Sequence, residues 1–122
     1  PAAARLKDGR VMVYGSMCGD GQPQTQAALF TRYAIQGVPL QESISRPRWL
    51  LGRTWGQTSD TLKLEGRFTA ETVSRLQALG HEVEMFPDFS EAMGHAGAIV
   101  RHPNGLFEGA FDPRSNGAAA GF

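Results

Sequence analysis

Residues 11–21 read VMVYGSMCGDG and lead directly into the segment Pro23–Gln36. The first four residues are apolar or aromatic, as is typical of a β-strand, and a glycine-rich stretch follows them. Beyond Pro23, apolar residues recur at helical spacing (Ala27, Phe30 and Ala34), with Gly37 placed as a C-terminal stop. The sequence therefore predicts a strand, a tight turn and a helix in direct succession.

The turn Gly15–Gly21 is the expected place for chemistry. A glycine-rich connection from a strand to a helix exposes backbone N–H groups near the positive end of the helix dipole, which suits an anion or a developing oxyanion. The glycine spacing matches neither a Walker loop nor a full dinucleotide fingerprint, so a phosphate site is not expected. The alternative is a tight turn that binds nothing.

Two hairpins are predicted, one near each end of the chain. The first turns at Lys7–Arg10 before Val11–Tyr14, and the second turns at Pro103–Gly105 between Ala98–Arg101 and Leu106–Glu108. Glycine in each turn permits the positive φ of a tight hairpin.

The middle of the chain predicts a short helix and a strand separated by an irregular connection. The helix is expected over Leu40–Ser45, because the Arg46-Pro47 pair that follows disfavours further helix. Arg48–Gln57 has no clean period and is expected to be irregular, and Leu62–Glu65 is expected to be a strand.

A further helix should begin after Thr69, which can cap it, with Phe68 and Val73 in the positions of a hydrophobic staple. Its expected buried face consists of Val73, Leu76 and Leu79, and Gly80 is expected to end it. The alternating segment His81–Phe86 predicts a strand. Together these elements predict an α/β (α+β) fold with an antiparallel component and a single domain over residues 1–122.

Composition excludes several classes of protein. The chain has 122 residues, of which 41% are hydrophobic and 20% charged, as is typical of a globular domain. Twelve basic residues balance twelve acidic ones, which gives no indication of a nucleic-acid partner, and no apolar run approaches a bilayer span. The single cysteine excludes an internal disulfide. Neither a cofactor nor a metal is expected, and no compartment is indicated.

Several residues outside the backbone of the turn carry alternative interpretations. Cys18 could be a nucleophile near a helix N-terminus, or simply a small residue in a crowded turn. The three histidines lack metal-pair spacing; His95 is the most site-like of them, although a histidine satisfied at the edge of the core is the commoner outcome. Charged residues beside tryptophans could form a stacking platform for single-stranded nucleic acid, although an interface or core-edge role is favoured: Arg46, Arg48, Arg53, Trp49 and Trp55. Asp112 and Arg114 suit a structural ion pair or an N-cap.

Four segments, taken in order, resemble the gamma-glutamyltranspeptidase family of N-terminal-nucleophile hydrolases. They are Tyr14–Gln26, Arg46–Arg48, Met93–Ala98 and Asp112–Ser115. The similarity covers essentially the whole chain and implies the closing part of the small subunit, whose complete fold is a four-layer α-β-β-α sandwich.

The resemblance implies a function. Family precursors cleave themselves to expose a threonine, whose hydroxyl attacks a gamma-glutamyl amide, and the acyl group passes to water or to an amine acceptor. Two consecutive N–H groups form the oxyanion hole, and alignment places them at Cys18 and Gly19, the first of which is usually glycine. The family's nucleophile, glutamate-recognition residues and paired serines all fall upstream of Pro1. None of the threonines of this chain has the nucleophile's sequence context (Thr25, Thr31, Thr54, Thr58, Thr61, Thr69 and Thr72).

The isolated chain is therefore expected to be inactive, with the remainder of its own precursor as its partner and a gamma-glutamyl substrate in the intact enzyme. A sheet without its covering segments is also expected to self-associate. A stand-alone interaction module without catalysis is the alternative from a different class of protein.

Overall fold

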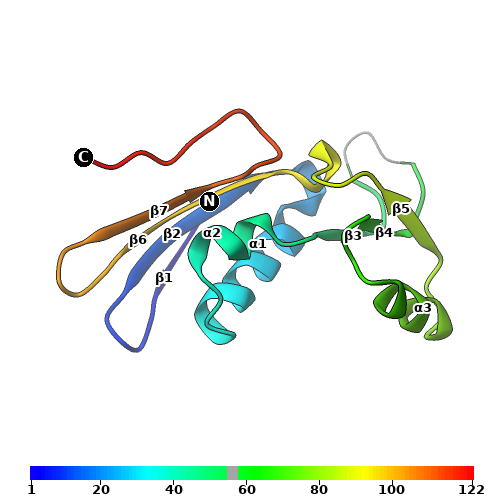
Figure 1. Cartoon of the computed structure of the whole chain (residues 1–122), viewed down its shortest axis with the longest axis horizontal. Helices are drawn as coiled ribbons and strands as arrows, with labels where there is room; N and C mark the ends of the chain where they lie inside the picture. The colour runs from blue at the N-terminus through cyan, green and yellow to red at the C-terminus, as the bar shows by residue number, and fades with distance from the viewer. Residues whose placement is uncertain (55–57) are drawn as a thin grey trace.

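The computed structural model describes residues 1–54 and 58–122 and contains two β-sheets (Figure 1). The larger sheet is antiparallel throughout, with strand order β1-β2-β6-β7. Its strands are β1 (Ala2–Arg5), β2 (Val11–Met17), β6 (His95–Arg101) and β7 (Phe107–Phe111). Both predicted hairpins are confirmed, with Gly9 at φ 93° and Gly105 at φ 89° in their turns. The strands of the second hairpin are longer than the sequence indicated.

Helices cover one face of this sheet (Figure 1). Helix α1 (Gln22–Phe30) continues into a π-helical turn (Thr31–Ile35), and α2 (Leu40–Ser45) has the predicted bounds. The helix predicted over Pro23–Gln36 is confirmed, and of its apolar residues Leu29 and Tyr33 are buried whereas Ala27 is exposed. The main core lies between these helices and the sheet, and consists of Met12, Leu29, Tyr33, Leu40, Ile44, Ala96, Ala98, Val100 and Ala110.

The second sheet has three short strands in the order β3-β4-β5. Both predicted strands of this part of the chain are present as β4 (Leu62–Glu65) and β5 (Val83–Phe86), although β5 begins two residues later than expected. The two strands pair in parallel. Strand β3 (Trp49–Leu51) pairs antiparallel with β4 and lies where an irregular connection was predicted. That prediction was wrong for these three residues because so short an apolar run shows no period, and its strand form depends on the partner strand.

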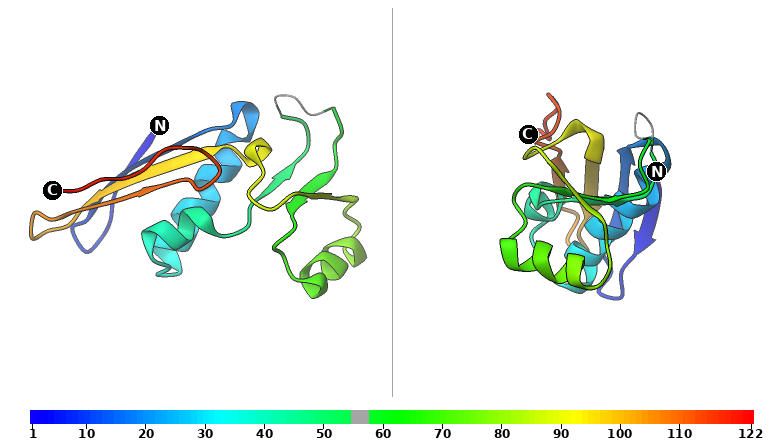
Figure 2. Two further views of the ribbon diagram at one scale, coloured as in Figure 1. Left: turned by 45° about the horizontal axis from the view of Figure 1, so that its top comes forward. Right: turned by 90° about the vertical axis from the view of Figure 1, so that its right-hand side faces the viewer.

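Helix α3 (Ala70–Ala78) lies beside the second sheet, away from the main core (Figure 2). The predicted cap is confirmed, since Thr69 Oγ1 accepts a hydrogen bond from the Thr72 N–H at 3.2 Å. The predicted buried face is only partly right: Val73 and Leu76 are half-buried while the other residues of α3 are exposed, and Leu79 is 78% exposed. Three short strands offer too little surface to cover the apolar side of this helix.

The opposite face of the larger sheet is apolar and open. Val13 and Ile99 alternate with buried core residues along their strands, and Val13, Ile99 and Phe107 are all more than half exposed. The C-terminal tail runs along this side of the sheet (Figure 1), where Ala118 and Ala119 help to line a shallow cleft. The described helices therefore cover only one of the two faces of the larger sheet.

Candidate active site

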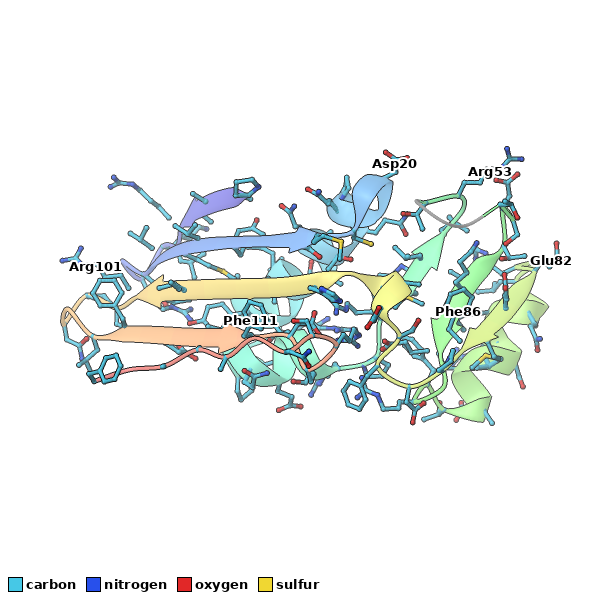
Figure 3. The ribbon with its side chains drawn as sticks, turned by 90° about the horizontal axis from the view of Figure 1, so that it is seen from above. Asp20, Arg53, Glu82, Phe86, Arg101 and Phe111 are labelled. Carbon is cyan, nitrogen blue, oxygen red and sulfur yellow. The ribbon has the colours of Figure 1, made fainter. Side chains whose placement is uncertain are left out.

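The glycine-rich turn lies at the end of β2, where the larger sheet approaches the second sheet. Figure 3 shows Asp20 at the tip of this turn. Gly19–Gly21 form a single 3-10 turn, after which α1 begins. Gly19 has φ 48°, a left-handed conformation that favours glycine, whereas Cys18 has φ −168°. Because an extended φ is open to any residue, the cysteine is compatible with this backbone geometry.

The backbone of the turn presents two successive N–H groups. Among residues 1–54 and 58–122, none accepts a hydrogen bond from the N–H of Cys18 or Gly19. The Cys18 carbonyl, in contrast, accepts hydrogen bonds from the Gly21 N–H at 2.8 Å and from Thr54 Oγ1 at 3.1 Å. Gly19 is exposed, so an incoming group can reach this side of the turn, whereas Cys18 is buried.

The thiol of Cys18 points into the protein. It belongs to a small core cluster with Leu50 and Met93, and Sγ lies 3.6 Å from the Ala92 carbonyl. Burial raises the pKa of the thiol above its ordinary value, which disfavours the thiolate that a nucleophile requires. These features argue against the alternative in which Cys18 is a nucleophile.

The segment Met93–Ala96 supports the turn from behind. The Met93 carbonyl accepts a hydrogen bond from Thr25 Oγ1 of α1 at 3.3 Å. Gly94 has φ 79°, and a Cβ there would lie 2.6 Å from the Cβ of Cys18 and also overlap the carbonyl oxygen of Met17. Only glycine fits this position. The segments Tyr14–Gln26 and Met93–Ala98, both part of the family resemblance, are therefore in direct contact.

A buried network of charges joins the other two segments of the family resemblance, Arg46–Arg48 and Asp112–Ser115. Asp112 pairs with Arg48 and, at 3.0 Å, with Arg114, and it also accepts a hydrogen bond from the Ala96 N–H at 2.7 Å. Arg114 in turn pairs through two nitrogens with Glu65 of β4. The structural ion pair expected between Asp112 and Arg114 is therefore present, within a larger network that joins the two sheets.

The pKa values in the network follow from burial and pairing. Burial opposes ionisation of Asp112, but the charge of Arg48 and hydrogen bonds from the backbone N–H groups of Ala96 and Arg114 outweigh it and hold the pKa of Asp112 below its ordinary value. Burial lowers the pKa of Arg48, with the nearby charge of Arg114 acting in the same direction. Asp112 is therefore an ionised partner of Arg48.

The remaining candidates do not gather at the turn. His102 contacts Glu108 at 2.9 Å, whereas His95, at the start of β6, is half-buried with Nε2 lacking a hydrogen-bond partner among the described residues. Arg46 and Arg53 form exposed ion pairs with acidic neighbours. Trp55 lies outside the described residues.

In residues 1–54 and 58–122, no three or more His, Cys, Asp or Glu side chains are grouped to hold a metal ion. Within the same ranges, no helix has both the length and the apolar character needed to cross a bilayer.

Three functional-looking residues were missed in the sequence. Thr54 contacts the turn although it is 36 positions from Cys18. The Glu65 carboxylate accepts a hydrogen bond from Arg114. Lys63 is fully buried, and its Nζ donates hydrogen bonds to the carbonyls of Gly52 and Ser59. The signal for the last two is a pair of charged residues within a short, otherwise apolar strand, which requires buried partners.

The fold is that of an N-terminal-nucleophile hydrolase. The transpeptidase CapD of Bacillus anthracis superposes with a TM-score of 0.80 over 100% of this chain and 69% of that chain, at 23% identity. The gamma-glutamyltranspeptidase of Pseudomonas nitroreducens, as its W525D mutant, gives 0.78 over 100% of this chain and 60% of that chain, at 22% identity. The family model of gamma-glutamyltranspeptidase matches residues 1–122, and the chain belongs to that family.

Curated relatives are considerably longer than this chain. Over its whole length it is 83% identical to the oxamate amidohydrolase proenzyme of Klebsiella pneumoniae, and the aligned region covers 23% of that protein. Over 90% of its length it is 46% identical to the glutathione hydrolase-like YwrD proenzyme of Bacillus subtilis, and the aligned region covers 21% of that protein. The chain thus spans less than a quarter of either relative.

Proposed function

We propose that this chain is the C-terminal part of a self-processing amide hydrolase and that it supplies the oxyanion hole through the N–H groups of Cys18 and Gly19. The observation that carries the proposal is the strand-to-helix turn with its exposed Gly19, in which no described residue accepts a hydrogen bond from the N–H of Cys18 or Gly19. Two preorganised donors at the positive end of α1 match the charge that develops on a carbonyl oxygen under attack.

In this proposal, the reaction is divided between this chain and the upstream part of its precursor. A threonine upstream of this chain attacks the amide carbon, and the negative charge of the tetrahedral intermediate forms on the oxygen beside Cys18 and Gly19. Collapse expels the amine and leaves an acyl-enzyme, which water or an amine acceptor then resolves. Each N–H donor accelerates such a reaction by about a hundredfold to a thousandfold.

Oxamate is the first candidate substrate, because it is named for the relative that is 83% identical. Oxamate is the monoamide of oxalic acid, so hydrolysis would release ammonium and leave oxalate. The carbonyl oxygen would accept hydrogen bonds from the turn, while the adjacent carboxylate would be held by residues outside this chain.

A gamma-glutamyl amide is the second candidate, with transfer of the gamma-glutamyl group from glutathione-type amides to water or an amine acceptor. It is favoured by the name of the Bacillus subtilis relative at 46% identity and by that of the Escherichia coli glutathione hydrolase proenzyme at 32%. Because the oxyanion turn recognises only the carbonyl oxygen, it serves either substrate equally well.

The test uses the full-length protein that contains this chain, purified after processing. Ammonium release from oxamate is compared with glutamate release from glutathione, at the same enzyme concentration. We expect a kcat/KM for oxamate at least tenfold higher than that for glutathione. The reverse order would support the gamma-glutamyl reaction, and inactivity of a correctly folded protein on both would favour the interaction module.

A further inference from the structure

We infer that Thr54 is a positioning residue, which orients the N–H of Gly19 by holding the other side of the same peptide group. The inference rests on the proposed oxyanion function and assigns to it a side chain outside the glycine-rich turn. Thr54 Oγ1 donates a hydrogen bond to the carbonyl oxygen of Cys18 at 3.1 Å.

The carbonyl of Cys18 and the N–H of Gly19 belong to one planar unit. In a trans peptide, the C=O and N–H bonds point in opposite directions, and rotation about the C–N bond is strongly resisted. A group that fixes the direction of the Cys18 carbonyl therefore fixes the direction of the Gly19 N–H. Thr54 holds this carbonyl from the inside, so the N–H is directed away from the core.

The Gly21 N–H also bonds to the Cys18 carbonyl, at 2.8 Å, but it is part of the same turn and would move with it. Thr54 comes from the segment after β3, and its hydroxyl therefore ties the turn to a separate element. Thr54 is only 8% exposed, so water does not readily replace this hydrogen bond.

The position of the segment before Thr54 is itself fixed to α1. The side-chain amide of Gln24 bonds to the backbone of Leu51 in both directions, donating to its carbonyl at 2.9 Å and accepting from its N–H at 2.8 Å. Gly21 packs tightly nearby, where a Cβ would come within 2.7 Å of Leu50 Cδ2. The hydroxyl of Thr54 thus reaches the turn from a segment that directly follows an anchored strand.

The first donor of the pair is held by a different contact. The N–H of Cys18 shares a peptide group with the Met17 carbonyl, which lies directly against Gly94. Thr54 therefore acts on the second donor alone, and its loss should weaken one of two hydrogen bonds to the oxyanion.

The experiment compares Thr54→Val with Thr54→Ser in the full-length processed protein. Valine keeps the shape of threonine and removes the hydroxyl, whereas serine keeps the hydroxyl. We expect Thr54→Val to lower kcat about tenfold with little change in KM, because a misdirected donor is lost chiefly in the transition state. Thr54→Ser should recover most of that kcat.

The matched control is Ser43→Ala, which removes another buried hydroxyl, in α2 and away from the turn, whose Oγ donates to the carbonyls of Val38 and Pro39 just before that helix. It should lower stability without the loss of kcat. If Thr54→Val retains the wild-type kcat, or if Thr54→Ser fails to recover it, the inference is wrong while the proposed function stands. If folded wild-type protein cleaves no amide, the proposed function and this inference both fail.

Discussion

Arg48 and Asp112 form an ion pair in the interior of the protein although 64 positions separate them in the sequence. Their side chains are 3% and 0% exposed, and the same Arg48 nitrogen also donates to the Gly94 carbonyl at 2.8 Å. Because Gly94 lies against the turn, this pair connects the C-terminal segment to the proposed oxyanion hole. The ion pair is a structural contact, and its loss should lower both the stability and the activity of the protein.

Removing one partner of this pair should be strongly destabilising. Asp112→Asn leaves the Arg48 charge buried without compensation, and we expect a loss of about 3–5 kcal/mol in the free energy of unfolding. Denaturant unfolding of the full-length protein measures it. The control is Glu42→Gln, which breaks an exposed pair with Arg46 and should cost less than about 1 kcal/mol. Equal losses in the two variants would contradict the role of burial.

Asp112 should also contribute to acid sensitivity. Its folded pKa lies below the ordinary value of 3.8, so its contribution to stability is present above that value and is lost as the pH falls toward the folded pKa. Stability measured between about pH 5 and pH 3 should therefore fall less steeply in Asp112→Asn than in the wild type. Ser43→Ala, which removes a buried hydroxyl and no ionisable group, should keep the wild-type slope.

Gly94 can be tested against a glycine that shares its conformation but not its surroundings. Gly94→Ala places a Cβ at φ 79° within 2.7 Å of Ser16 Oγ and 2.6 Å of the Cβ of Cys18, and should lower both stability and kcat. Gly105→Ala meets the same type of backbone strain at φ 89° in open space, and should cost only about 1 kcal/mol. Similar kcat values for the two variants would show that Gly94 does not shape the turn.

The thiol of Cys18 should react slowly. It is 6% exposed and burial raises its pKa, so iodoacetamide at neutral pH should modify it far more slowly in the folded protein than after denaturation. Mass spectrometry of the alkylated protein gives both rates. Rapid, selective modification of the folded protein would restore the thiol as a candidate nucleophile.

The isolated chain of 122 residues should self-associate. Val13, Ile99 and Phe107 form an exposed apolar surface on the side of the larger sheet that faces away from the helices. Association should weaken when Ile99→Lys is introduced, because a charge disfavours burial of this face. Light scattering across a range of concentrations measures this, and a monomer at high concentration would contradict the prediction.

Local patterns predicted much of the fold, because the relevant interactions are close in sequence. The turn at Lys7–Arg10, the bounds of α2 and the Thr69 cap all depend on residues within a few positions of one another. Strand β3 could not be predicted in this way, since three residues carry no period. The burial of α3 was overestimated because amphipathic spacing does not reveal how much surface the neighbouring sheet provides.

The candidate site divides in the same manner. The backbone donors at Cys18 and Gly19 were proposed from the turn and from the family resemblance, and the ion pair of Asp112 with Arg114 was expected from their proximity. The contact of Thr54 with Cys18 joins segments that no local pattern connects, so it required the three-dimensional structure.

The central claim is that this chain is the closing part of an amide-cleaving proenzyme, and the most direct test is the intact mass and N-terminal sequence of the native protein. We expect two polypeptides from one precursor, the smaller beginning with a threonine upstream of Pro1 and containing this chain at its C-terminal end. A single unprocessed polypeptide beginning near Pro1 would contradict the claim.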